Sequence, residues 1–146
     1  MTRKAQKTCY IRTFGCQMNE YDSEVLESIL SAHGYMITSN PEEANLAVVN
    51  TCSVRDHAEI KALSRLGALK KPKARRPEMV VGVIGCMAER DPDGIFAKAP
   101  HVDLVCGPAR GGCLRLPLGC CGGRFLLRAG RWSMSMSVEL EFADRL

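Results

Sequence analysis

The stretch CYIRTFGCQMNEYDSE, Cys9 to Glu24, decides the fold because two kinds of structure meet within it. Its apolar, β-branched first part predicts a buried strand over Tyr10–Phe14. A Gly-Cys pair at positions 15 and 16 ends that strand, and a polar segment rich in acids then begins a helix. The same order recurs in LAVVNTCSVRD around Cys52 and in MVVGVIGCMAERD around Cys86. A thiol therefore stands at the exit of three predicted strands.

Strands and helices alternate over the first 108 residues. We expect further strands over Tyr35–Thr38, Leu46–Val49, Met79–Ile84 and Val102–Val105. Helices are expected over Glu20–His33, from Ser53 to about Lys70 with Ile60, Leu63 and Leu66 inward, and over Pro92–Ala99. This order predicts an α/β fold, a mostly parallel sheet flanked by helices in a doubly wound arrangement.

The ends of the predicted elements follow from single residues. Asn19 is the expected N-cap of the first helix, and Gly34 the glycine that closes it. Ser53 is the expected cap of the second helix. The segment KKPKARRPE, Lys70–Glu78, holds two prolines and is expected to be a basic loop.

The composition of the 146 residues is that of an ordinary globular chain, with 46% apolar residues, 25% charged residues and a net charge of +4. Residues 8–108 are expected to form one domain. Residues 109–146, rich in glycine, arginine and cysteine, are expected to form an irregular, poorly ordered tail. No secretory signal or membrane-spanning run is evident, which favours a cytoplasmic protein without a membrane partner. The mild positive charge permits an anionic partner such as RNA but does not require one.

The three thiols at the strand exits are 36 and 34 residues apart, the length of one strand-helix-strand unit each. In a parallel sheet the carboxyl ends of all strands lie at one edge, so Cys16, Cys52 and Cys86 are expected to meet there. Each precedes a helix, whose N-terminus favours a thiolate. Three thiolates without a local fourth suit a 4Fe-4S cluster with one open iron. Two alternatives stay open: zinc with His57 as a further ligand, and three small buried hydrophobic residues.

The motifs TFGCQMNEYDSE, PEEANLAVVNTCSVRDHAEIKALSRLGALK, VVGVIGCMAERD and APHVDLVCGP follow one another over about residues 8–110. Together they resemble the N-terminal domain of the tRNA methylthiotransferases. These are radical S-adenosylmethionine enzymes, and the resemblance favours the branch that acts on isopentenylated adenosine beside the anticodon. The resemblance implies that Cys16, Cys52 and Cys86 hold an auxiliary 4Fe-4S cluster whose open iron carries the sulfur destined for the base.

Five polar residues flank these cysteines: Gln17, Asn19, Asn50, Ser53 and Arg55. We expect them to donate hydrogen bonds to cluster sulfurs and so to tune the cluster. Helix capping or loop solvation is the alternative for each of them, above all for Asn19 and Ser53.

The chain departs from the family in its second part. The family needs a second 4Fe-4S cluster, bound by C-x-x-x-C-x-x-C, to cleave S-adenosylmethionine, and this spacing is absent. Cys113, Cys120 and Cys121 do not reproduce it, and the family's RNA-binding β-barrel is missing too. We therefore expect a truncated, catalytically incomplete form, with tRNA as the family substrate, weak tRNA binding and no DNA binding. A non-catalytic RNA- or protein-binding module and a degenerate fragment are the competing hypotheses.

Overall fold

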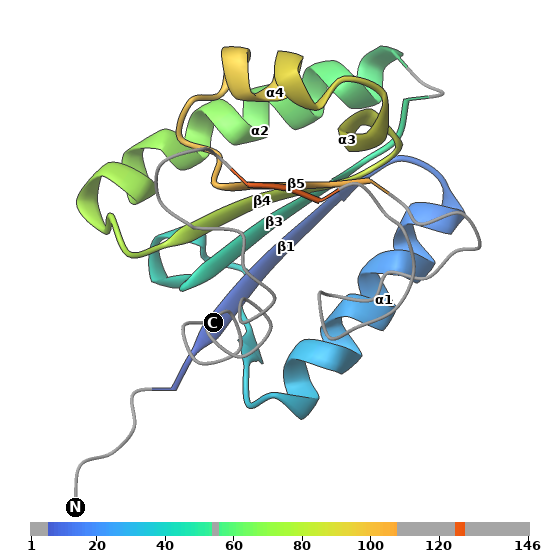
Figure 1. Ribbon diagram of the computed structural model, residues 1–146. Helices are drawn as coiled ribbons and strands as arrows, with labels where there is room; N and C mark the ends of the chain where they lie inside the picture. Colours follow the sequence, from blue (N-terminus) through green and yellow to red (C-terminus); the bar gives the residue numbers. More distant parts are fainter. Residues whose placement is uncertain (1–5, 54–55, 108–124, 128–146) are drawn as a thin grey trace, which may run out of the picture.

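The computed structural model describes residues 6–53, 56–107 and 125–127 of the chain (Figure 1). Its strands are β1 (Thr8–Phe14), β2 (Met36–Ile37), β3 (Leu46–Thr51), β4 (Val80–Gly85), β5 (Leu104–Cys106) and β6 (Phe125–Leu127). Its helices are α1 (Gln17–Ala32), the short 3₁₀ helix η1 (Pro41–Glu43), α2 (Asp56–Arg75), α3 (Cys86–Arg90) and α4 (Pro92–Lys98). The strands and helices alternate as expected.

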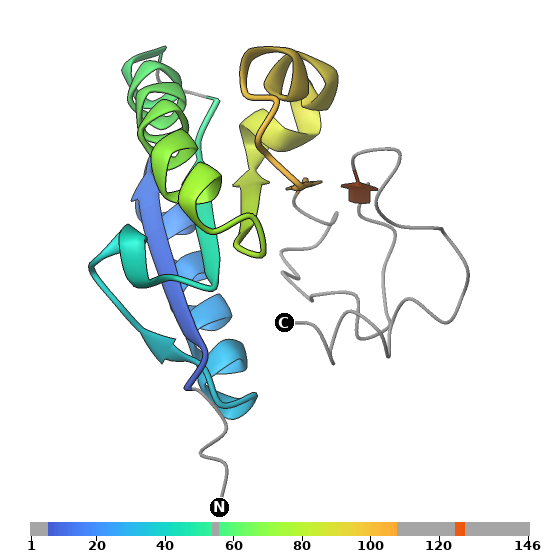
Figure 2. The same cartoon turned by 90° about the vertical axis from the view of Figure 1, so that its left-hand side faces the viewer.

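The strands form one sheet in the order β2-β1-β3-β4-β5-β6. Strands β1 to β5 are parallel, and β6 pairs antiparallel with β5. Helix α1 covers one face of the sheet, and α2, α3 and α4 cover the other (Figures 1 and 2). The predicted α/β fold with a mostly parallel, doubly wound sheet is confirmed. Because the chain adds β2 on one side of β1 and β3 on the other, the strand order reverses between β1 and β3, where ligand sites form in such sheets.

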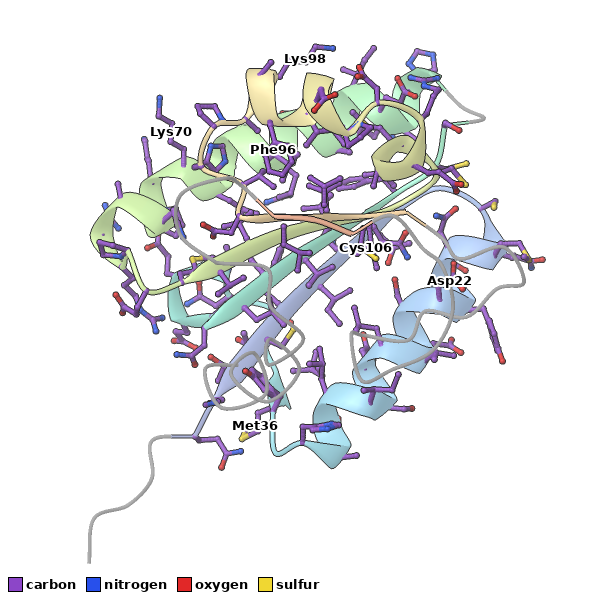
Figure 3. The ribbon with its side chains drawn as sticks, in the orientation of Figure 1. Asp22, Met36, Lys70, Phe96, Lys98 and Cys106 are labelled. Carbon is purple, nitrogen blue, oxygen red and sulfur yellow. The ribbon has the colours of Figure 1, made fainter. Side chains whose placement is uncertain are left out.

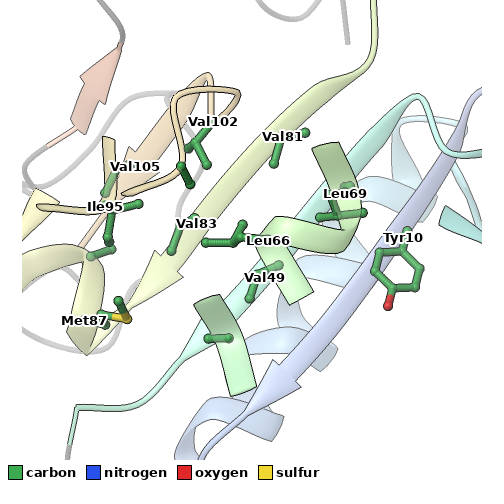
Figure 4. Close-up of a cluster of buried hydrophobic side chains, with 14 of the residues drawn as sticks. Tyr10, Val49, Leu66, Leu69, Val81, Val83, Met87, Ile95, Val102 and Val105 are labelled. Carbon is green, nitrogen blue, oxygen red and sulfur yellow. The ribbon is translucent and has the colours of Figure 1, made fainter. Parts of the chain in front are cut away.

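Two apolar cores hold the layers together. The larger core lies between the sheet and α2, α3 and α4, with Val49, Val81, Val83 and Leu66 at its centre (Figure 4). The smaller core packs Leu26 and Leu30 of α1 on the other face of the sheet. Strand β3 is buried along its whole length, as a central parallel strand between two helical layers must be. In the described residues no helix is both long enough and apolar enough to cross a membrane.

Helix α2 is longer than predicted and includes most of the basic segment. The expected loop at Lys70–Glu78 is wrong up to Arg75, because α2 continues through Pro72. Pro72 is buried, and Lys73 donates to the Met79 carbonyl and pairs with Asp103 at 2.6 Å. These contacts anchor the last turn, where a proline removes only one backbone hydrogen bond.

Three local predictions also need correction. Asn19 is not the N-cap of α1, because the helix begins two residues earlier with Cys16 as its cap. Ile60 was expected to face inward, yet 64% of it is exposed, because the buried stripe of α2 is Ala58, Ala62, Leu66 and Leu69. Strand β6 was not predicted within the tail; the remainder of residues 109–146 lies outside the described part of the chain.

Candidate metal centre

Three neighbouring strands end at the same level of the sheet. Phe14 of β1, Thr51 of β3 and Gly85 of β4 are aligned across the two ladders. Cys52 and Cys86 are the next residues on their strands, and Cys16 follows Phe14 by two positions. The backbone N–H of Cys52 donates to the Phe14 carbonyl at 3.0 Å, which fixes the β1 and β3 ends together. The sheet therefore places all three cysteines at its carboxyl edge.

Two glycines allow the three loops to come close. A Cβ added to Gly15 would lie 2.6 Å from the Cys52 Cβ and 2.5 Å from the Asn19 Oδ1. A Cβ added to Gly85 would lie 2.1 Å from the Thr51 carbonyl oxygen. Gly85 also has a φ of +102°, which side chains rarely adopt. At the position before each outer cysteine, a residue other than glycine would therefore displace the end of β3 or its neighbours.

The three sulfurs differ in their exposure but interact with one another. Cys52 is buried between the exposed Cys16 and Cys86. The Cys16 and Cys52 side chains are hydrogen-bonded. Besides desolvation, the neighbouring thiols raise the pKa of Cys86 by electrostatic repulsion, and Cys52 has a larger effect than Cys16. Cys52 therefore lies between the two outer cysteines, as β3 lies between β1 and β4.

The acidity of the outer thiols differs. Backbone N–H groups of Asn19 and Met18, at the start of α1, lower the pKa of Cys16. Partial desolvation and the neighbouring Cys52 raise the pKa of Cys86, although the Ser53 backbone N–H opposes this effect. The expectation that each helix N-terminus favours a thiolate thus holds for Cys16 and is wrong for Cys86. Helix α3 has only five residues, and two thiols stand next to Cys86.

A buried network of polar side chains lies beneath Cys16. Asn19 Nδ2 donates to Asn50 Oδ1 at 3.0 Å and to the Thr51 carbonyl at 3.1 Å. Asn50 Nδ2 donates back to the Asn19 carbonyl at 2.8 Å and to Ser23 Oγ at 2.9 Å. The Ser23 hydroxyl also bonds to Thr13 Oγ1 at 2.7 Å. The network joins β1, α1 and β3 behind the cysteines.

The five polar residues expected around a cluster have different positions. Asn19 and Asn50 are buried, and their amide groups bond to protein atoms. Gln17 is exposed at the first position of α1. Ser53 reaches Cys86 through its backbone N–H. Arg55 lies outside the described residues.

The other cysteines and His57 were not expected to bind the cluster, apart from His57 in the zinc alternative. Cys9 is buried in the smaller core, and Cys106 of β5 packs against that core from the edge (Figure 3). Cys113, Cys120 and Cys121 lie outside the described residues. His57 is exposed on the first turn of α2.

Ser23 and Thr13 support this edge, although neither was predicted to do so from the sequence. A signal was available for Ser23, because it is a polar residue in the stripe of α1 that otherwise buries Leu26 and Leu30. Thr13 carried no comparable signal, since threonine is common in strands.

The donors that this edge offers to a metal group are the thiols of Cys16, Cys52 and Cys86. Across the described residues, no group of three His, Cys, Asp or Glu side chains is arranged to hold one metal ion. In a 4Fe-4S cluster each thiolate binds a different iron, so the sulfurs surround the inorganic core instead of meeting at a point. Three thiols that follow three adjacent strands could each bind a different iron of such a cluster.

Comparison with known proteins adds an independent line of evidence. The model of the uncharacterized protein family UPF0004 matches residues 8–107. A protein of Rhodopirellula baltica named tRNA-2-methylthio-N(6)-dimethylallyladenosine synthase is 53% identical over 104 residues, which is 71% of this chain and 22% of that protein. Proteins of the same name from a Janthinobacterium species and from Chromobacterium violaceum are each 50% identical, over 70% of this chain and 23% of their own length. The chain thus spans less than a quarter of these relatives, and the resemblance found from the motifs is confirmed.

Proposed function

Because the chain belongs to the UPF0004 family, we propose that residues 8–107 form a domain that binds a 4Fe-4S cluster through Cys16, Cys52 and Cys86. The observation that carries this proposal is the common edge of β1, β3 and β4, where two glycines let three thiol-bearing loops approach. The names of the relatives support a role in the 2-methylthio modification of tRNA.

The protein's own groups would receive such a cluster in different ways. The lowered pKa of Cys16 favours the thiolate that binds iron, and its exposure lets the cluster assemble from solution. Cys52 is buried beneath, so a cluster bound there would be shielded on its inner side. When bound by three cysteines, the cluster supplies one iron without a protein ligand, a place for an exchangeable sulfur-containing group. The Ser53 N–H, already on Cys86, would remain as a donor to a ligand sulfur.

The proposed cluster site would not by itself be sufficient for the complete reaction. The proposed substrate is a tRNA with an isopentenylated adenosine, which is an inference from the relatives' names, and the proposed compartment is the cytoplasm. The spacing C-x-x-x-C-x-x-C, which would bind the second cluster that cleaves S-adenosylmethionine, does not occur in these 146 residues. We therefore expect this chain alone to bind a cluster but to leave tRNA unmodified.

The test is reconstitution of the full chain with iron and sulfide under anaerobic conditions. About four irons per chain, with the electron paramagnetic resonance signal of a reduced 4Fe-4S cluster, are expected. The variant with Cys16, Cys52 and Cys86 replaced by alanine should bind none. The matched control replaces Cys113, Cys120 and Cys121 and should keep the cluster. Colourless wild-type protein, or equal iron in both triple variants, would refute the proposal.

The structure does not favour the competing RNA-binding role of the basic segment. Lys73, Arg75 and Arg76 form ion pairs with Asp103, Glu42 and Glu78, respectively. Lys70 lies on α2, five residues before the end of the helix and away from the carboxyl edge (Figure 3). Salt-sensitive RNA binding that survives in the triple cysteine variant would be the result that supports this role instead. Failure of the chain to fold would support the third hypothesis, a fragment without function.

A further inference from the structure

We propose that Asn19 and Asn50 are a positioning pair, which holds the Cys16 loop against the end of β3 before any metal is bound. The pair is reciprocal: each amide donates to an oxygen of the other residue, at 3.0 and 2.8 Å. Both residues are almost fully buried, with 4% and 0% of their surfaces exposed. Hydrogen bonds between buried amides are costly to break singly, because the remaining partner stays unsatisfied.

The contacts of Asn19 connect directly to the cysteines. Its Oδ1 accepts from the Cys16 backbone N–H at 3.4 Å and lies 3.4 Å from the Cys16 sulfur. Its Nδ2 donates to the carbonyl of Thr51, the residue before Cys52. One side chain thus touches the residue at the start of α1 and the backbone that precedes the central thiol.

This assignment differs from the role expected of the two residues as donors to cluster sulfurs. Both Nδ2 protons of each amide are directed to protein oxygens: Asn50 Oδ1 and Thr51 O for Asn19, and Asn19 O and Ser23 Oγ for Asn50. A primary amide has two donor protons, so neither amide has a proton left for a sulfur. The pair acts on the site through the position of Cys16, and it rests on the proposed function only for the effect on iron binding.

The chain offers a matched control on the same strand. Asn45 lies just before β3, at its other end, and its Oδ1 accepts from the Thr8 backbone N–H at 2.9 Å. It ties β3 to β1 at the end of the strands opposite to Cys16, Cys52 and Cys86, as Asn50 ties β3 to α1 beside them. Asn45→Ala therefore measures how far the loss of a side-chain amide that links β3 to its neighbour destabilises the protein in general.

The first measurement uses the metal-free chain and so does not depend on a cluster. Dibromobimane, which becomes strongly fluorescent when it bridges two thiols, is applied to a background in which only Cys9, Cys16 and Cys52 remain. Cys9 lies seven residues before Cys16, near the opposite end of β1 and about 20 Å away, so a short reagent can bridge only Cys16 and Cys52. Asn19→Ala and Asn50→Ala should each slow bridging about tenfold, and the double variant should lose no more than one single variant. Asn45→Ala should bridge at the unsubstituted rate.

A second variant covers the event that the alanine variants do not fold. Ser23→Ala removes one of the two acceptors of Asn50 Nδ2 and leaves the reciprocal bonds in place, so it should fold and slow bridging only slightly. Circular dichroism establishes folding for every variant. The second measurement is iron per chain after reconstitution, which should fall in Asn19→Ala and stay unchanged in Asn45→Ala.

The outcomes separate the two proposals. Slower bridging together with lower iron supports both. Slower bridging in the two alanine variants, together with a wild-type chain that binds no iron, supports the positioning pair and refutes the cluster. Bridging rates in folded Asn19→Ala and Asn50→Ala equal to that of Asn45→Ala overturn the positioning pair, whatever the iron content.

Discussion

Gly85 lies so close to Thr51 that a Cβ at position 85 would stand 2.1 Å from the Thr51 carbonyl oxygen. The same carbonyl accepts a hydrogen bond from Asn19 on the other side, at 3.1 Å. The end of β3 is therefore enclosed by the loop that carries Cys86 and by the helix that begins after Cys16. A change at either contact must displace one of the two outer thiols.

The first prediction concerns Gly85→Ala. The substitution combines a φ of +102° with the contact at Thr51, so we expect the free energy of unfolding to fall by about 2–4 kcal/mol. Urea unfolding, monitored by circular dichroism, measures this free energy. Gly34→Ala is the control, because Gly34 has a φ of +85° but nothing within 4 Å of an added Cβ, and it should cost about 1 kcal/mol. Equal losses would mean that the contact with Thr51 is unimportant.

The second prediction concerns Gly15→Ala. A methyl group there pushes against Asn19 and Cys52, so we expect reconstituted iron to drop well below that of the wild type even where the chain stays folded. Gly67→Ala, in the open on α2, should instead stabilise the protein by about 0.5–1 kcal/mol and keep the full iron content. Iron analysis and thermal unfolding on the same samples test this, and full iron in Gly15→Ala would contradict it.

A third prediction concerns the Tyr35 hydroxyl, which is buried and lacks a hydrogen-bond partner among the described residues. Burial and the nearby Cys9 raise the pKa of Tyr35 from 10.0 to about 12. At pH 7 Tyr35→Phe removes an unsatisfied polar group, so stability should stay equal or rise by about 1 kcal/mol. Tyr21→Phe, at a position that is 62% exposed, should change nothing.

Tyr35→Phe should also change how the stability of the protein depends on pH in the alkaline range. An unfolded tyrosine loses its proton near pH 10 and the folded one only near pH 12, so the wild type loses stability between these values. Tyr35→Phe removes this part of the loss. Burial and Glu27 also raise the pKa of Cys9, from 9.0 to about 12, so a remaining decline that begins near pH 9 is expected in both proteins. Chemical unfolding at pH 7, 9 and 11 measures both slopes, and parallel curves for wild type and variant would contradict the assignment.

A fourth prediction concerns Asp103, which pairs with Lys73 at 2.6 Å and accepts from the Val81 N–H at 3.0 Å in a half-buried place. Asp103→Ala leaves a buried cation and a backbone N–H behind, and we expect a loss of about 3 kcal/mol. Glu42→Ala breaks the exposed pair with Arg75 and should cost at most about 0.5 kcal/mol. Denaturant midpoints compare the two, and similar losses would show that Lys73 finds another partner.

The sequence was sufficient to predict the layers and the edge where the cysteines gather. Strand runs such as Met79–Ile84 and closing residues such as Gly34 carry strong local signals, and parallel topology then brings the strand ends together. The end of α2 was predicted wrongly because Pro72 usually stops a helix, while its burial and the partner of Lys73 depend on residues about thirty positions away. The partners of the Asn19 and Asn50 amides likewise lie about thirty positions away in the sequence. An amide in a sequence shows its hydrogen-bonding capacity, but only the fold shows which atoms use it.

Along helix α2, Lys70 and Lys71 lie about 20 Å from the first turn, which is near the thiols. That distance has a practical use. Coupling the protein to a surface through Lys70 and Lys71 would leave the sulfur-bearing rim turned toward the solution. Because lysines also stand at positions 4, 7, 61, 73 and 98, this orientation requires that only Lys70 and Lys71 react with the surface.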